Sequence, residues 1–136
     1  MKVGFVILCY GNLPMIEECV SKLFKLEGII DSEIILVDNC SPDGTGKKLQ
    51  CKYKGCANIH VILNKENSGF ARGNNIGYSF AKKELHCDVQ VVMNSDVFID
   101  DAQFVKKLQD TIEHHPDVAI IGPDALGKNN RHSNPL

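Results

Sequence analysis

The sequence lacks long apolar runs and blocks of charge of one sign. Its first apolar stretch, residues 3–10, is too short to cross a bilayer, and no signal-peptide cleavage site follows it. The 136 residues carry 15 basic and 17 acidic side chains, a formal net charge of -2. That balance offers no electrostatic footprint for nucleic acid. We therefore expect no nucleic-acid partner and no transmembrane segment in this chain.

Paired cysteine motifs are also missing. None of the six cysteines forms a Cys-x-x-Cys pair, which argues against a zinc or thioredoxin-like site. Because no secretory signal is present, we expect reduced thiols in a cytoplasm. Cys51 and Cys56 leave a bridge or a metal site as a minor alternative. Cys9, Cys19 and Cys87 lie in apolar stretches and are expected in the core.

Two motifs of common enzyme classes are absent as well. The five histidines show no metal-ligand spacing such as His-x-x-x-His. The dinucleotide fingerprint Gly-x-Gly-x-x-Gly does not occur either. The functional evidence therefore has to come from the ends of the predicted strands.

What the sequence does contain is an alternation of apolar runs and amphipathic segments. Strands are expected at residues 3–9, 33–37, 59–63, 89–93 and 118–121. Helices are expected after a cap at Asn12, between the turn at 41–44 and Tyr53, over 69–83 and over 102–114. This order is typical of a mostly parallel sheet with crossover helices.

Two of the predicted strands end in polar clusters that carry a carboxylate. Asp38 follows the second strand, and Asn94-Ser95-Asp96 follows the fourth. Both clusters have plain structural explanations as turns or helix caps. Ligands of open α/β sheets, however, bind at the carboxyl ends of strands. One Asp together with phosphate oxygens suits Mg²⁺ or Mn²⁺, while Asp38 can accept hydrogen bonds from a base or a ribose. Tyr10, just past the first strand, can stack on a base or cover the sheet edge.

Residues 67–77 carry glycines at steps of four, which one face of a helix would stack. For Gly73 and Gly77 we favour close packing of the helix onto the sheet. For Gly69 we favour close approach of backbone to a ligand, with Arg72 reaching toward it. The asparagines are poor helix formers and indicate capping or hydrogen bonds to a ligand: Asn67, Asn74 and Asn75.

In this order, segments 9–12, 37–44, 67–77 and 93–97 resemble family 2 glycosyltransferases with the GT-A fold. The last two are closest to the rhamnosyltransferase-like branch. The resemblance implies a Rossmann-like GT-A three-layer α/β/α sandwich with a mostly parallel sheet, truncated. Residues 1–123 would form its nucleotide-sugar-binding half. Residues 124–136 would be a polar tail leading to an acceptor-binding half that this chain lacks.

The resemblance also implies an inverting sugar transfer from a nucleotide-diphosphate donor to a glycan or lipid-linked acceptor. UDP- or dTDP-sugars are the expected donors, and Asp96 would hold Mg²⁺ or Mn²⁺. Asn94 replaces the first Asp of the family's Asp-x-Asp motif and brings no charge. The expected donor contacts are Tyr10, Asp38, Asn39, Gly69, Arg72, Asn75 and Asn94.

No catalytic base is identified, because the later carboxylates are expected to be caps, turn residues or surface groups. The family further implies polysaccharide synthesis at the inner face of a membrane, and an open sheet edge invites a homodimer. Two other functions stay open. One is a nucleotide-binding module without transfer chemistry. The other is a nucleotidyltransferase, for which residues 9–12 lack a basic glycine-rich loop.

Overall fold

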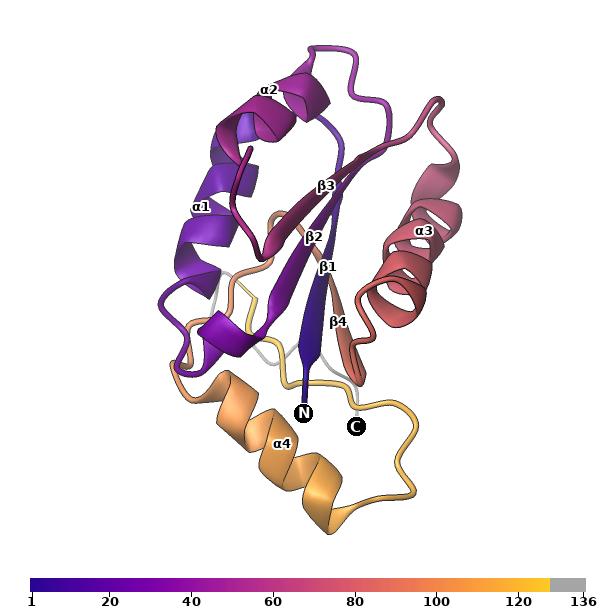
Figure 1. The fold of residues 1–136 in the computed structure, drawn as a ribbon. Coiled ribbons are helices and arrows are strands. Elements are labelled where there is room, and N and C mark those ends of the chain that lie inside the picture. The colour runs from indigo at the N-terminus through magenta and orange to yellow at the C-terminus, as the bar shows by residue number, and fades with distance from the viewer. Residues whose placement is uncertain (128–136) are drawn as a thin grey trace.

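The structure is a computed structural model that describes residues 1–127. Strands and helices alternate along the described chain, as the sequence predicts (Figure 1). The elements in order are β1 (Val3–Cys9), α1 (Leu13–Leu23), the 3-10 helix η1 (Ile29–Asp31), β2 (Glu33–Asp38), α2 (Thr45–Lys52), β3 (Ile59–Leu63), α3 (Gly69–Lys83), β4 (Val89–Asn94) and α4 (Phe104–His114).

The four strands form one parallel sheet in the order β3-β2-β1-β4. β1 and β2 are apolar over almost their whole length, as strands covered on both faces must be. The register pairs Cys9 with Asp38, Leu8 with Asn94, and Asp38 with Leu63. All four strands therefore end together. We call this end of the sheet, at Cys9, Asp38, Leu63 and Asn94, the carboxyl edge.

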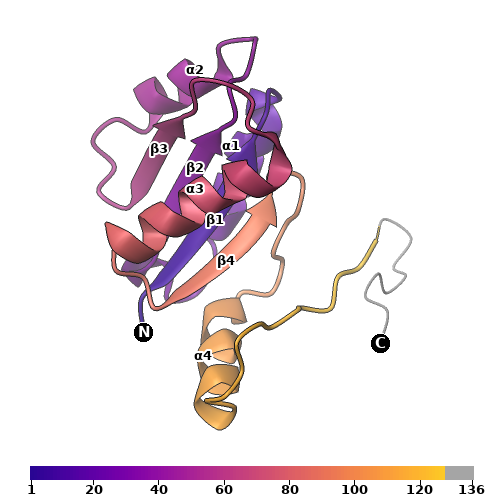
Figure 2. The ribbon, with the colours of Figure 1, turned by 90° about the vertical axis from the view of Figure 1, so that its right-hand side faces the viewer.

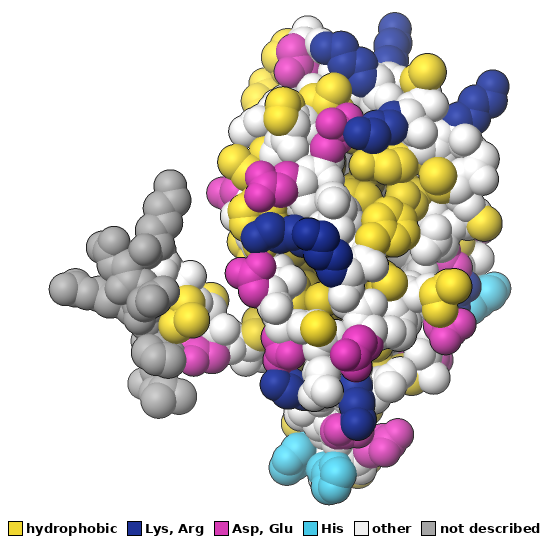
Figure 3. Space-filling view, turned by 90° about the vertical axis from the view of Figure 1, so that its left-hand side faces the viewer, with side chains coloured by type: hydrophobic (Ala, Val, Ile, Leu, Met, Phe, Trp, Pro, Cys, Tyr) yellow, Lys and Arg dark blue, Asp and Glu magenta, His cyan; other side chains and the backbone are white. Residues whose placement is uncertain are grey.

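Helices cover both faces of the sheet and make three layers. α1 and α2 lie on one side and α3 on the other (Figure 1), and Figure 2 shows α3 lying across the strands. Alternate residues of β1 pack into two hydrophobic cores, one on each face of the sheet. Phe5 and Ile7 pack with Ile16 of α1, whereas Val6 joins the smaller core that includes Ala81 of α3. Figure 3 views the face formed by α1 and α2, where basic and acidic side chains are interspersed.

The glycines of α3 allow this helix to lie directly on the sheet. A Cβ on Gly77 would overlap Val6 Cγ1 and would stand 2.8 Å from Val37 Cγ2. A Cβ on Gly73 would stand 2.5 Å from Leu8 Cδ1. Distances under about 3 Å leave no room for a methyl group against buried side chains. The predicted packing role of both glycines is confirmed.

The strand predicted at residues 118–121 is wrong. This segment has no regular structure, and Ile120 is 90% exposed. In Figure 2 the chain leaves α4 and runs away from the sheet, so these residues have no neighbouring strand to pair with. An apolar run of four residues gains nothing from extended structure unless another strand satisfies its backbone.

The predicted cap at Asn12 is only half right. Asn12 is the residue before α1, but its side chain makes no capping hydrogen bond. Gly11 and Asn12 both adopt left-handed backbone conformations, with φ of 66° and 56°, which Asn tolerates better than most residues. The first turn is held instead by the Asn12 carbonyl, which accepts from the backbone N–H groups of Met15 and Ile16 at 3.1 and 3.3 Å.

All six cysteines are free in the described structure. Cys9, Cys19 and Cys87 are buried, which confirms their predicted place in the core. Burial raises the pKa of the Cys19 thiol to about 11 and also raises the pKa of Cys9. Both thiols are therefore kept neutral, as apolar core residues should be.

Candidate functional site at the carboxyl edge

The order of the strands singles out one position along the carboxyl edge. The chain moves from β1 to β2 and β3 on one side of the sheet, then returns to place β4 on the other side of β1. In open α/β sheets the crevice at such a reversal is where ligands bind. The reversal here lies between β1 and β4, so the residues that follow these two strands are the first candidates.

Exposed polar side chains meet at this reversal. Tyr10, directly after β1, is 57% exposed. Asn94 ends β4 and is paired in register with Leu8, two residues before Tyr10. Asp96 is exposed in a turn closed by a hydrogen bond from Val97 N to Asn94 O at 3.2 Å. An aromatic ring, an amide and a carboxylate are thus exposed after the ends of these two neighbouring strands.

Asp96 differs from Asp100 and Asp101, the two carboxylates that follow it most closely. Asp100 accepts from Lys22 Nζ at 3.0 Å. Asp101 pairs with Lys107 at 2.6 Å and accepts from the N–H of Gln103 near the start of α4. The hydrogen bond from Lys107 lowers the pKa of Asp101. These two carboxylates have surface and turn roles, which are among those that the sequence predicts.

The residues at this turn fit a metal ion that is held mainly by the phosphate oxygens of a bound molecule and only in part by the protein. Within residues 1–127, no group of three or more His, Cys, Asp or Glu side chains could hold a metal by itself. The exposed donors here are the carboxylate of Asp96 and the amide oxygen of Asn94. Mg²⁺ and Mn²⁺ prefer oxygen ligands, and Mg²⁺ commonly takes one or two carboxylates with phosphate oxygens and water.

Asp38 lies deeper at the edge and bonds to its own turn. The residue is only 5% exposed. It accepts hydrogen bonds from the backbone N–H of Ser41 at 3.1 Å and from the Ser41 hydroxyl. The Ser41 hydroxyl oxygen in turn accepts from Gly11 N at 2.7 Å. Asp38 therefore ties the loop after β2 to the loop after β1, which carries Tyr10.

Asn39 is equally buried, at 4% exposure. Its side chain bonds to a different loop from the one that Asp38 holds. Its partners all belong to the loop between β3 and α3 or to the first residue of α3. The sequence did not reveal this link, because the partners are 25 to 30 residues away. The cluster of Asn64, Asn67 and Ser68 at the loop was its one visible signal.

The start of α3 brings further predicted residues to the carboxyl edge, because α3 begins shortly after β3 ends. Arg72 and Asn75 are exposed on its first turns. Gly69 has a φ of 78° and open space where a Cβ would stand. Its conformation, rather than crowding, is what calls for glycine.

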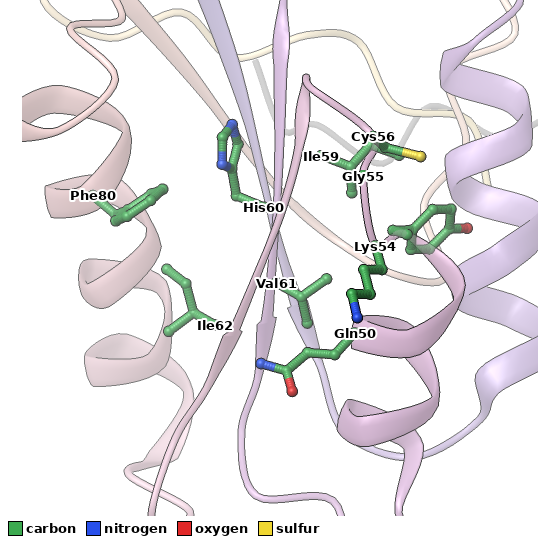
Figure 4. Close-up of a pocket in the computed structure, with 10 residues that line it drawn as sticks. Gln50, Lys54, Gly55, Cys56, Ile59, His60, Val61, Ile62 and Phe80 are labelled. Atoms are coloured by element: carbon green, nitrogen blue, oxygen red, sulfur yellow. The ribbon is translucent and has the colours of Figure 1, made fainter.

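The hollows in the surface lie elsewhere. One runs along the outer side of β3, where Figure 4 shows His60 and Phe80 on one flank and Gln50 and Lys54 on the other. Another lies near the amino ends of the strands, against Lys2 and Val105. The candidate site is therefore defined by strand topology and exposed polar side chains.

Comparison with known proteins points to one family. The family model described as "Glycosyl transferase family 2" matches residues 5–135. A dolichol-phosphate mannosyltransferase of Pyrococcus furiosus is 31% identical over 123 residues, which cover 88% of this chain and 32% of that protein. The uncharacterized glycosyltransferase EpsJ of Bacillus subtilis is 28% identical over 120 residues, covering 88% of this chain and 33% of that protein.

Solved structures agree on the fold. Residues 1–349 of S. aureus TarS in complex with UDP-GlcNAc match with a TM-score of 0.68 at 23% identity, over 85% of this chain and 32% of that one. The mannosyltransferase PcManGT of Pyrobaculum calidifontis, in complex with GDP-Man and Mn2+, matches with a TM-score of 0.68 at 18% identity, over 81% and 32%. The GT-A fold is confirmed, and the chain spans about a third of the length of these relatives.

Proposed function

Because this chain belongs to glycosyl transferase family 2, we propose that it supplies the donor and metal site of an inverting glycosyltransferase. The enzyme would move a sugar from a nucleotide-diphosphate donor to a glycan or lipid-linked acceptor. The observation that carries the proposal is that Tyr10, Asn94 and Asp96 are all exposed at the ends of β1 and β4, where the strand order reverses. That position is where the fold offers a crevice to a nucleotide.

Each exposed side chain has a chemical task in this proposal. The ring of Tyr10 stacks on the base, and Asn94 hydrogen-bonds the ribose. Arg72, whose guanidinium is always charged, lies within reach of the diphosphate and attracts it. Asn75 adds a hydrogen bond from the next turn of α3. Gly69 lets the backbone approach the ligand without a side chain in the way.

We also propose that Asp38 contacts the base, as the sequence predicts. A carboxylate offers about four acceptor sites, and the turn at Ser41 takes two of them. The remaining capacity suits an N–H of a pyrimidine or guanine base. Its burial restricts that contact to a planar base edge that enters the crevice between the loops.

Asp96 would hold Mg²⁺ or Mn²⁺ together with oxygens of the diphosphate. Such an ion neutralises the charge that develops on the leaving diphosphate. Asn94 supplies a neutral oxygen where a second carboxylate would add charge, so we expect weak metal affinity without nucleotide. UDP- and dTDP-sugars remain the proposed donors. GDP is included in the tests because one structural neighbour was solved with GDP-Man and another with UDP-GlcNAc.

We also propose that the catalytic base is supplied from outside residues 1–127. Inverting transfer needs a carboxylate that takes the proton of the acceptor hydroxyl. The two carboxylates that follow Asp96 most closely, Asp100 and Asp101, pair with lysines. On this proposal we expect little or no transfer by this chain alone. The rhamnosyltransferase-like branch, polysaccharide synthesis, a homodimer and a cytoplasmic place at the inner face of a membrane stay predictions. No helix among residues 1–127 is long and apolar enough to span a membrane.

The proposal is tested by calorimetric titration of the chain with UDP, dTDP and GDP, with and without Mn²⁺. We expect one nucleotide to bind in a manganese-dependent way. Asp96→Ala should weaken that binding about tenfold or more, since even outer residues of metal sites change affinity on this scale. Asp100→Ala is the matched control, because it removes a neighbouring carboxylate that already pairs with Lys22.

Two results would overturn the proposal. One is the absence of binding by a chain whose circular dichroism shows that it is folded. The other is equal binding by Asp96→Ala and the unaltered chain. Release of free nucleotide from a nucleotide sugar, measured alongside, should be slight, because the proposed base lies outside residues 1–127. Rapid release would overturn that part of the proposal.

A further inference from the structure

We infer that Asn39 is a positioning residue, which holds the loop after β3 and the start of α3 in place instead of touching the nucleotide. The inference rests on the proposed function and refines it. It assigns a different task to one residue that the sequence placed among the donor contacts. Its basis is the set of hydrogen bonds that surrounds this one buried amide.

The hydrogen-bonding capacity of the Asn39 side chain is filled by the protein. Its Oδ1 accepts from Asn64 Nδ2 at 3.0 Å and from the backbone N and hydroxyl of Ser68 at 3.1 and 3.2 Å. Its Nδ2 donates to Asn67 Oδ1 at 2.9 Å and to the Gly69 carbonyl at 3.4 Å. An amide has two donors and two acceptor lone pairs. Nothing is left over for a ligand.

These bonds join β2 to the beginning of α3. Asn67 Oδ1, which receives the Asn39 amide, also accepts from the backbone N–H of Gly69 at 3.0 Å. The backbone of Asn64 is fixed as well, since its N–H donates to Asp38 O at 2.9 Å. The loop of residues 64–68 is therefore attached at both of its ends.

Fixing this loop also fixes the side chains that α3 presents. Arg72 follows Gly69 by nearly one helical turn, and Asn75 follows Arg72 by the same spacing. One turn into the helix, Gly73 lies so close to the sheet that a Cβ there would stand 3.5 Å from Asn39 Cγ. Asn39 thus holds the start of α3 by hydrogen bonds and lies near its first turn at Gly73.

Asp38 and Asn39 each hold a different loop at the carboxyl edge. The Asp38 carboxylate holds Ser41 and, through its hydroxyl, Gly11 beside Tyr10. Asn39 holds the loop that leads to Arg72. Successive residues of a strand point to opposite faces, so these neighbours at the strand end reach opposite sides of the sheet. The exposed contacts of the nucleotide are thereby set by a buried polar pair beneath them.

The first test measures the loop itself, by amide hydrogen exchange without nucleotide. Asn39→Ala should make the Ser68 and Gly69 amides exchange about tenfold faster, because the acceptors of these N–H groups are lost or released. Asn39→Asp keeps an acceptor for Ser68 and Asn64 but loses the donated bonds, so exchange should rise mainly at Gly69. Asn67→Ala serves if Asn39→Ala fails to fold, since Asn67 is exposed and holds the same Gly69 amide.

The second test asks whether the loop acts on the nucleotide through Arg72. UDP, dTDP and GDP are titrated with Mn²⁺ against Asn39→Asp, Arg72→Ala and the double variant. We expect each single variant to weaken binding about tenfold, and the double variant to be little worse than Arg72→Ala, because groups that act through one another are not additive. Gln90→Ala is the control. It removes an amide that donates to Cys87 O at 2.8 Å at the start of β4, far from the carboxyl edge.

The outcomes separate the two proposals. If no nucleotide binds the unaltered chain, the proposed function fails, and the site that Asn39 would position fails with it. If a nucleotide binds and the Ser68 and Gly69 amides exchange unchanged in the Asn39 variants, only the inference about Asn39 fails. Additive losses in the double variant would likewise overturn it, since they are the mark of an independent contact.

Discussion

Polar residues at the carboxyl edge fall into a buried and an exposed group. Asp38 and Asn39 are buried and bonded to protein, whereas Tyr10, Arg72 and Asp96 are exposed. Buried polar groups must find partners, and here the partners lie in the loop that carries Tyr10 and in the loop that leads to Arg72. Buried and exposed polar residues at this edge therefore do different work.

At the opposite end of the sheet, the charge of a single residue, Glu33, contributes to the stability of the fold. Glu33 pairs with Lys2 Nζ and with His60 Nε2, both at 2.8 Å. Burial raises the pKa of Glu33, but the hydrogen bonds from Lys2 and His60 outweigh it and lower the pKa below its usual value. A carboxylate with a lowered pKa stabilises the fold above the unfolded pKa, about 4.3 for Glu. That contribution is lost as the pH falls through the folded value.

We therefore predict that Glu33→Gln lowers the free energy of unfolding by about 1 kcal/mol at pH 7. The difference from the unaltered chain should shrink below about pH 4, where both chains carry a neutral side chain at this position. Urea unfolding at a series of pH values measures it. Glu84→Gln, at an exposed residue just after α3, is the control. A Glu33→Gln effect of the same size at every pH would contradict this explanation.

At the scale of elements, the strands and helices were predictable wherever an apolar pattern was long. β1 and α3 have the predicted bounds, and β2 and β4 each extend one residue further, to Asp38 and Asn94. The segment at 118–121 was misjudged, because an apolar run does not reveal whether a strand is available for it to pair with. The hydrogen bonds of Asn39 were equally hidden, since they depend on how β2 and α3 come together in space.

The packing of α3 gives a prediction at this scale. Gly77→Ala places a methyl group against Val6 and Val37, so the chain should lose about 1–3 kcal/mol of stability. That loss exceeds the gain of up to about 1 kcal/mol from the higher helix propensity of Ala. Thermal and urea unfolding measure the change.

The same explanation is checked by making room for the methyl group. Val6→Ala removes the Cγ1 atom that Gly77→Ala would overlap. In the double variant the cost of Gly77→Ala should therefore fall by about half or more, a coupling expected for residues in contact. An unchanged cost in the Val6→Ala background would mean that overlap with Val6 is not its cause.

At the scale of the whole molecule, the sheet formed within residues 1–127 brings its four strand ends to one edge and is open on both sides. β3 and β4 each have a neighbour on one side only, and the chain spans about a third of its relatives. The fold class and the family could be predicted from the order of the motifs. The depth of each site residue could not, because burial is a property of the assembled layers.

The most direct test of the account is to locate a bound metal ion by its paramagnetic effect. Mn²⁺ is added with the nucleotide that binds best, and the ¹⁵N amide spectrum of the chain is recorded. The account predicts selective broadening of amides around Tyr10 and residues 94–97, abolished by Asp96→Ala. Broadening centred on the hollow at His60 and Lys54, or on His114 and His115, would contradict it, because the ion would then lie away from the reversal of strand order.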